Sequence, residues 1–150
     1  MEIKIRKMQT DDAMQVAAMN ELLAHTEEKA TRADAQFFRE HALESDRIAT
    51  IYVAAEGKKI VGFIGYRDWA SFATKKKVRQ IDLLYVDEEY EGLGIATDLL
   101  EHVRLDAVQS GCGRLDIQTE TSNEDSNALY KKFGFEIKPD TRNHYRMFLD

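Results

Sequence analysis

Residues 78–109 place an apolar, β-rich run, a glycine-containing loop and a helical run one after another. The first run, VRQIDLLYV, is typical of a strand, and its apolar second half predicts burial on both faces of a sheet. The helix predicted over 95–109 ends at the glycines of SGCG, and its inward-facing residues are expected to be Leu99, Leu100, Val103 and Val108. A strand that leads through a loop into a helix predicts an α/β fold.

Strands and helices are also predicted before this segment. Ile3 and Ile5 alternate with charged residues and indicate a first strand, and helices are predicted over 10–25 and 33–44. Two β-branched, aromatic-rich runs predict a hairpin around 56–58. The apolar residues at helical spacing in the first helix are Met14, Ala17, Ala18, Leu22 and Leu23.

After the central helix we expect a strand over 114–120, a short helix over 123–133 and two strands over 135–139 and 144–150. The complete order is β-α-α-β-β-β-α-β-α-β-β. This order predicts an α/β fold with a mixed, mostly antiparallel central sheet flanked by helices.

Length and composition indicate one domain over residues 1–150. A chain of 150 residues buries about two thirds of its unfolded surface, and 43% hydrophobic with 32% charged residues is ordinary for a globular protein. The net charge of −6 disfavours general nucleic-acid binding, so the basic run at 75–79 is interpreted as a solvated loop tip. No apolar run approaches the roughly 20 residues of a membrane helix, so we expect no membrane partner.

Cysteine and histidine offer little chemistry in this sequence. One cysteine rules out an internal disulfide, and Cys112, between two glycines, is interpreted as a helix-end residue rather than a nucleophile. The four histidines lack paired metal-ligand spacing, so no metal site is expected. The N-terminus MEIKIRKM reads as a strand rather than a signal peptide, which favours a cytoplasmic location.

The glycine loop lies where a helix begins and permits two interpretations. Unpaired N–H groups and the helix dipole attract anions there, and glycine lets the backbone approach a phosphate closely. An ordinary turn before a helix is the alternative. The loop lacks the lysine followed by serine or threonine that ends a P-loop motif, and Thr97 replaces the third glycine of a dinucleotide fingerprint. Both of those motifs are therefore poor fits.

Two motifs together resemble the GNAT superfamily of acyl-CoA-dependent N-acetyltransferases. EGLGIA, residues 91–96, is similar to the signature [QR]-x-x-G-x-[GA], with Glu91 in place of glutamine or arginine. NEDSNALYKKFGF, residues 123–135, resembles the asparagine, tyrosine and Gly-Phe pattern that closes the family's domain. The element order also matches, so the resemblance spans nearly the whole chain and implies a GNAT-like fold.

The resemblance implies acetyl-CoA as the co-substrate. It assigns the pantetheine arm to backbone groups of the strand before the loop, and it assigns the pyrophosphate to N–H groups of the loop. It also implies a contact to the cofactor from Asn123. The implied cofactor-binding residues are Leu84, Tyr85, Val86, Glu91, Gly92, Leu93, Gly94, Ile95, Ala96, Thr97 and Asn123.

The same resemblance implies catalytic roles. Tyr130 matches the tyrosine that protonates the leaving thiolate, and the alternative is a packed aromatic residue beside Phe133. Gln80 stands where one branch of the family has a glutamate base. The candidate bases here are therefore Asp82, expected to face the same way as Gln80 in a regular strand, and Glu120. For each carboxylate, an exposed or ion-paired acid is the alternative.

The predicted function is transfer of an acetyl group from acetyl-CoA to a primary amine by direct attack in a ternary complex. The acceptor is a small molecule or a peptide, and a homodimer is possible. The rival hypotheses are a non-catalytic acyl-CoA sensor on the same fold and a nucleotide-binding oxidoreductase fragment that binds NAD. Four aromatic residues are assigned to the core, with some of them candidates for the acceptor pocket: Phe37, Phe38, Trp69 and Phe72.

Overall fold

A computed structural model describes residues 2–26, 31 and 33–149. Its elements fall into two compact units, residues 1–120 and 121–150, and each is described by itself. The first unit holds a five-stranded sheet whose order follows the chain. Its strands are β1 (Lys4–Lys7), β2 (Thr50–Glu56), β3 (Lys59–Ser71), β4 (Lys76–Val86) and β5 (Cys112–Ile117). Whether the chain forms a single domain stays a prediction.

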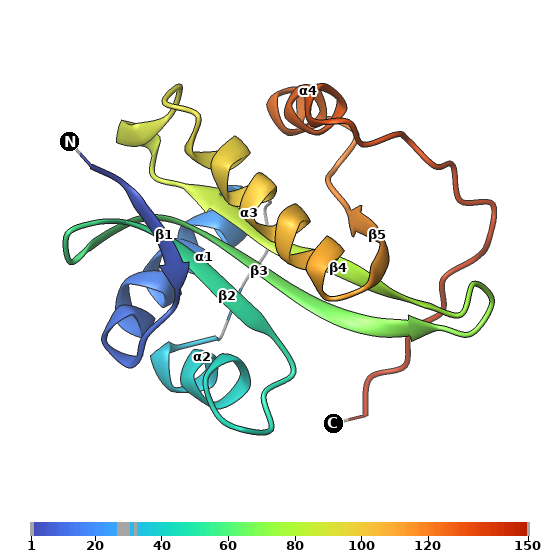
Figure 1. Ribbon diagram of the computed structural model, residues 1–150, viewed down its shortest axis with the longest axis horizontal. Coiled ribbons are helices and arrows are strands. Elements are labelled where there is room, and N and C mark those ends of the chain that lie inside the picture. The colour runs from blue at the N-terminus through green and yellow to red at the C-terminus, as the bar shows by residue number, and fades with distance from the viewer. Residues whose placement is uncertain (1, 27–30, 32, 150) are drawn as a thin grey trace. The chain divides into compact units, whose positions relative to one another are not determined.

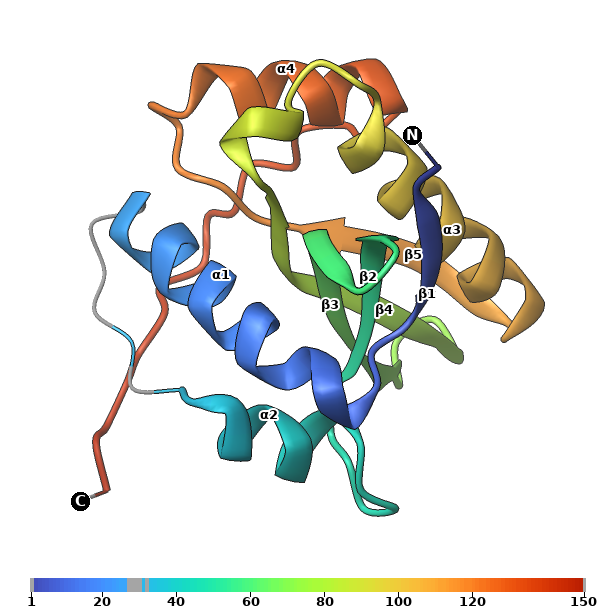
Figure 2. The same cartoon turned by 90° about the vertical axis from the view of Figure 1, so that its left-hand side faces the viewer.

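The sheet is mixed and mostly antiparallel, as predicted. The strands from β1 to β4 pair antiparallel, whereas β4 and β5 pair in parallel. A parallel pair needs a crossover connection, and α3 (Ile95–Gln109) provides it. Helices α1 (Ala13–Thr26) and α2 (Ala35–Ala42) cover one face of the sheet and α3 covers the other (Figures 1 and 2).

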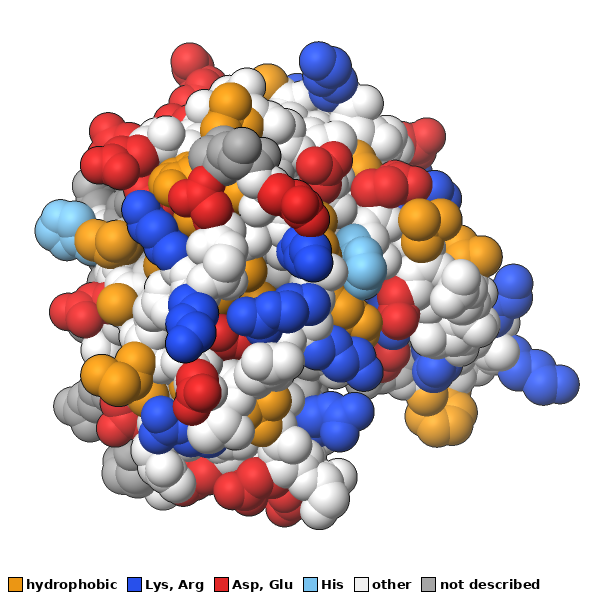
Figure 3. All heavy atoms as spheres, turned by 60° about the vertical axis from the view of Figure 1, so that its left-hand side comes forward, with side chains coloured by type: hydrophobic (Ala, Val, Ile, Leu, Met, Phe, Trp, Pro, Cys, Tyr) orange, Lys and Arg blue, Asp and Glu red, His pale blue; other side chains and the backbone are white. Residues whose placement is uncertain are grey.

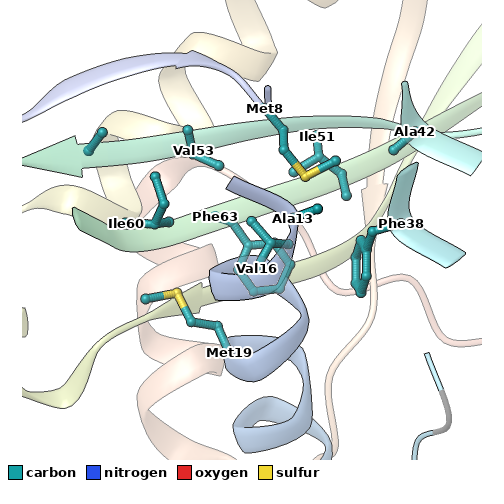
Figure 4. Packing of buried hydrophobic residues seen from close by; sticks show 11 residues of the cluster. Met8, Ala13, Val16, Met19, Phe38, Ala42, Ile51, Val53, Ile60 and Phe63 are labelled. Atoms are coloured by element: carbon teal, nitrogen blue, oxygen red, sulfur yellow. The ribbon is translucent and has the colours of Figure 1, made fainter. Parts of the chain in front are cut away.

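The core between the sheet and α1 is built from both layers (Figure 4). Val16 and Phe63 are fully buried at its centre, and Phe38 closes it from α2. Of the four aromatic residues assigned to the core, only Phe38 is buried. Phe37, Trp69 and Phe72 are exposed, so their assignment to the core was wrong.

Two predicted apolar stripes were also wrong in detail. In α1 the buried residues are Ala13, Val16, Met19 and Asn20, whereas Met14 and Leu22 are exposed. In α3 the stripe continues from Leu99 through Val103 to Ala107, and Val108 is exposed. Residues three or four apart share a helix face, and Val108, five residues after Val103, lies outside the buried face.

The second unit contains α4 (Glu124–Phe133). The strands predicted over 135–139 and 144–150 are not formed over residues 135–149, and Asp150 lies outside the described residues. Asp140 accepts hydrogen bonds from the backbone and side chain of Arg142, so a local turn separates the two runs. A strand is stabilised by its partner, and alternating apolar residues do not create one.

The entry into α1 depends on one buried carboxylate. Arg6 of β1 binds Asp12 through two nitrogens at 2.6 and 3.1 Å, and the Gln9 N–H donates to Asp12 at 2.7 Å. Burial alone would raise the pKa of Asp12, but the hydrogen bonds from Arg6 and Gln9 outweigh burial, and the pKa lies below its ordinary value. This ionised group therefore joins β1 to the short 3-10 turn η1 (Thr10–Asp12) that precedes α1.

We expect Asp12→Asn to lower the free energy of unfolding at pH 7 by about 1–3 kcal/mol, since it weakens charged hydrogen bonds at a buried site. A depressed pKa stabilises the fold above the ordinary carboxyl value of about 4 and stops doing so as the pH falls through the folded-state pKa. Urea unfolding at pH 7 and pH 3 should therefore show a smaller difference from wild type at pH 3. The control, Asp11→Asn at an exposed neighbour, should change stability by less than about 0.5 kcal/mol. A difference that is equal at both pH values would contradict the role of the charge.

Candidate active site

Strands β4 and β5 pair only along part of their length. Their parallel register runs from Lys77 opposite Cys112 to Ile81 opposite Ile117, where β5 ends. Strand β4 continues to Val86, paired on its other side with β3. Along 82–86, therefore, one edge of β4 faces no strand among the described residues. We call this separation of β4 from β5 the split. It opens toward Val86, the end of β4 from which the chain runs on to α3.

A β-bulge marks the point where the strands separate. Gly65 of β3 pairs with Leu83 and Tyr66 pairs with Ile81, so Asp82 is the extra residue of β4. The expectation that Asp82 faces the same way as Gln80 assumed a regular strand, and the bulge breaks that alternation. Asp82 lies where β4 and β5 separate, just past their last paired residues, and accepts a hydrogen bond from Arg67 at 3.0 Å. The ion-paired alternative for Asp82 is thus realised.

The free edge 82–86 is less covered than the sequence suggested. Leu84, Tyr85 and Val86 are half-buried, so the prediction of burial on both faces was wrong for them. The cause is the early end of β5, which leaves this side of β4 without a neighbour. Unpaired backbone N–H and C=O groups of a strand are ready partners for another extended chain.

The glycine loop delivers the N-terminus of α3 at the open end of the split. Gly92 and Gly94 have φ of 78° and 80°, a region that disfavours residues with a Cβ. Gly94 is the N-cap of α3, and no side chain caps the helix. The first N–H groups of α3, at Ile95, Ala96 and Thr97, therefore have neither an intrahelical partner nor a capping side chain. These groups suit an anion.

Tyr90, which the sequence analysis did not single out, anchors this loop. It lies in the 3-10 turn η2 (Glu88–Tyr90), and its hydroxyl donates to Glu56 Oε1 at 2.9 Å. Lys59 Nζ lies 3.4 Å from the same hydroxyl and 5.0 Å from the ring centroid. The loop is thereby held to the β2–β3 hairpin. Only the fold brings these residues together, so no local motif could have revealed the contact.

The charge around the loop is negative. Glu91 is exposed and near other carboxylates at the start of the loop and of α3: Asp87, Glu88, Glu89 and Asp98. Burial raises the pKa of Tyr85, and the charges of Asp87, Glu88 and Glu91 raise it further. The negative potential of these groups therefore reaches the free edge of β4. These carboxylates would oppose an anion at the N-terminus of α3.

The asparagine and the glycine of the second motif, residues 123–135, lie at the two ends of α4. The Asn123 side-chain oxygen accepts from the Ser126 N–H at 3.1 Å and caps the helix. At the other end Gly134 has φ of 122°, and the Phe135 N–H bonds the Tyr130 carbonyl at 2.9 Å, which closes the helix as in a Schellman motif. The rings of Tyr130 and Phe135 then meet edge to face at 5.9 Å. The glycine and the phenylalanine therefore orient Tyr130.

Other candidate groups are placed as follows. Glu120 is exposed and follows the end of β5, on the side where the split opens. Cys112 begins β5 instead of ending the helix, and burial raises the pKa of its thiol. The residues that the structure describes include no group of three or more His, Cys, Asp or Glu side chains arranged to hold a metal ion.

Two further observations concern surfaces. No helix within the described ranges is long and apolar enough to cross a membrane. On the face shown in Figure 3, basic side chains lie among acidic and apolar ones. That neither nucleic acids nor membranes are partners stays a prediction.

Comparison with known proteins identifies the family. The model of the acetyltransferase (GNAT) family matches residues 16–135. The chain belongs to the GNAT family. An uncharacterized N-acetyltransferase of Methanocaldococcus jannaschii is 29% identical over 97 residues, which are 64% of this chain and 43% of that protein. The matches to curated relatives span less than half the length of those proteins.

Solved structures share the fold of this GNAT protein. A ribosomal-protein-alanine N-acetyltransferase of Brucella melitensis superposes with a TM-score of 0.77 at 24% identity, covering 98% of this chain and 100% of that one. An aminoglycoside acetyltransferase from a soil metagenomic sample, in complex with sisomicin, gives 0.79 at 15% identity, covering 98% and 97%. The GNAT-like architecture predicted from the sequence is confirmed.

We expect Gly94→Val to abolish stabilisation by acetyl-CoA, because a branched side chain at this N-cap blocks the approach of a phosphate. Gly111→Val, just beyond the other end of α3, is the matched control. The two glycines have φ of 80° and 79°, and a Cβ at either would meet nothing within 4 Å. Both variants should therefore lose a similar 1–2 kcal/mol or so to backbone strain. Thermal melts with and without acetyl-CoA should separate them, and equal responses to acetyl-CoA would contradict the assignment.

Proposed function

We propose that this GNAT protein transfers an acetyl group from acetyl-CoA to an amine by direct attack in a ternary complex. The observation that carries the proposal is the split between β4 and β5, open at the end where the uncapped N-terminus of α3 lies. An extended arm can lie along the free edge of β4 while an anionic group meets the helix. Acetyl-CoA has both parts, a pantetheine arm and a pyrophosphate.

In this proposal the backbone of Leu84, Tyr85 and Val86 binds the pantetheine arm as an added strand would. The N–H groups of the loop and of the first turn of α3, residues 92–97, hold the pyrophosphate. Glu91 needs no contact with the phosphates, because backbone groups make the bonds. Asn123 contacts the cofactor through its amide nitrogen, since its oxygen caps α4.

The chemistry requires a neutral amine, a polarised thioester and a proton for the leaving sulfur. The amine nitrogen attacks the carbonyl carbon and forms the C–N bond, after which the C–S bond breaks and the thiolate departs. Tyr130 is the proposed acid that protonates this sulfur. The amine loses its proton to a carboxylate or to a water chain. Asp82 and Glu120 are the candidates, with Asp82 favoured by its place where β4 and β5 separate and limited by its ion pair with Arg67.

Proteins with this fold are named for different acceptors. One structural neighbour is named for a protein substrate and another for aminoglycosides, although the fold is the same. A panel should therefore contain a peptide with N-terminal alanine, a polyamine, an aminoglycoside and a lysine peptide. Release of free CoA thiol with any of them supports the enzyme. Acetyl-CoA binding without turnover would favour the sensor, and NAD binding without CoA binding would favour the oxidoreductase. A homodimer and a cytoplasmic location stay predictions.

We expect Tyr130→Phe to lower kcat on the order of 10²-fold with little change in acetyl-CoA affinity, because the hydroxyl acts only as charge builds on sulfur. Tyr145→Phe, at an exposed position of the same unit, is the control and should leave kcat unchanged. Steady-state kinetics with the best acceptor, together with a burst measurement to show that chemistry limits the rate, provides the test. An unchanged kcat under those conditions would make Tyr130 a packing residue.

We expect Glu91→Gln to tighten acetyl-CoA binding by a few-fold, because it removes one charge that repels the pyrophosphate. The exposed position limits the effect to about 1 kcal/mol or less, and salt should reduce it. Calorimetric titrations at low and high salt test this, with the exposed Glu21→Gln of α1 as the control for net charge. Weaker binding by Glu91→Gln would instead give Glu91 a specific role in shaping the loop.

A further inference from the structure

Arg79 is the most deeply buried charged residue among those that the structure describes, with 2% of its surface exposed. It lies on β4 and donates two hydrogen bonds to Asp68 of β3, at 2.9 and 3.0 Å. Its third nitrogen donates to Asp106 of α3 at 2.8 Å and to the Val103 carbonyl at 3.3 Å. One guanidinium thus joins two strands and the crossover helix.

Aromatic and thiol groups complete this cluster. The guanidinium stacks on the ring of Tyr66 at 3.9 Å. Cys112, the first residue of β5, lies with its Sγ 4.0 Å from Asp68 Oδ2. The cluster therefore includes residues of β3, β4 and β5, as well as of α3.

The Arg79 cluster lies where β4 and β5 are still paired, next to the split. In the parallel ladder Arg79 lies opposite Leu115, two residues before the pairing ends at Ile81. The cluster consequently occupies the closed base of the split. Asp106 and Val103 lie in the second half of α3, and the first turn of the same rigid helix presents the N–H groups of 95–97. An anchor at one end of a helix fixes where its other end lies.

Charge makes the anchor strong. Burial opposes the charge of Arg79, but the hydrogen bonds to Asp68 and Asp106 raise its pKa above the ordinary value. Burial would raise the pKa of Asp106, yet the bond from Arg79 lowers it overall. Removing the guanidinium would leave two partly exposed carboxylates near one another without their shared cation, and their repulsion would loosen the contact between β3 and α3.

We propose that Arg79 is a positioning residue: it keeps the base of the β4–β5 split closed and fixes α3, so that the free edge 82–86 and the loop 92–97 stay aligned for one ligand. The alignment with acetyl-CoA rests on the proposed function, whereas the closing of the split does not. Arg79 lies at the closed base, so its action on the ligand passes through β4 and α3.

Cys112 provides a native probe of this closing, because it is the single cysteine and lies at the base of the split. Its thiol is half-buried, and burial raises its pKa, so reaction with a disulfide reagent such as DTNB is slow in the closed state. Opening of the base exposes it. The labelling rate therefore follows the open population and needs no cofactor or acceptor.

The experiment compares Arg79→Met with Arg104→Met. Arg104 is an exposed arginine on α3 whose ion pair with Glu101 lies on the helix surface. We expect Arg79→Met to speed Cys112 labelling about tenfold or more and Arg104→Met to leave it within about twofold. Arg79→Lys keeps the charge but lacks the planar guanidinium, so its labelling rate should fall between those of Arg79→Met and wild type. In kinetics, Arg79→Met should raise the KM for acetyl-CoA far more than it lowers kcat.

Circular dichroism melts establish that each variant is folded at the assay temperature. If Arg79→Met does not fold, Asp106→Asn replaces it, since this change weakens the link to α3 and leaves the two bonds to Asp68 in place. Labelling that is unchanged in the folded variant would overturn the proposal. Faster labelling in a protein that binds no acetyl-CoA would support the closing role and refute the proposed function instead.

Discussion

The parallel hydrogen bonds between β4 and β5 stop at Ile81 and Ile117, and the rest of the site depends on that stop. A bulge at Asp82 turns β4 at the same point, so the two strands separate instead of continuing as one sheet. The crossover helix α3 begins at the open end because a parallel pair requires its connection to return to the start of the next strand. One break in a ladder therefore places a free strand edge and a helix N-terminus together.

The loop at this site combines opposing electrostatic effects. Uncapped N–H groups and the helix dipole favour an anion, whereas Glu91 and its acidic neighbours oppose one. We expect the N–H groups to prevail, because solvent screens the exposed carboxylates while the N–H groups point along a fixed helix axis. The glycines at 92 and 94 supply the positive φ that this turn needs. Tyr90 then holds the turn to the β2–β3 hairpin, which limits its motion without adding positive charge.

Local patterns predicted most elements, and long-range pairing explains what they missed. The β2–β3 turn, the start of α3 at Ile95 and the glycine end of α4 each depend on residues near in sequence, and the structure has them. The bulge at Asp82, the early end of β5 and the Arg79 cluster arise where distant segments meet, so no local pattern encodes them. The two final strands were predicted from short local runs of residues, and a local run does not provide a partner strand.

The central claim is that one ligand binds along β4 and at the start of α3. The most direct measurement is an amide NMR titration of the isotopically labelled protein with acetyl-CoA and, separately, with NAD. We expect acetyl-CoA to shift the amide signals of 84–86 and 92–97 together, with a single dissociation constant, while NAD leaves them in place. Shifts confined to other segments, such as α1 and β1, or a response to NAD alone, would contradict it.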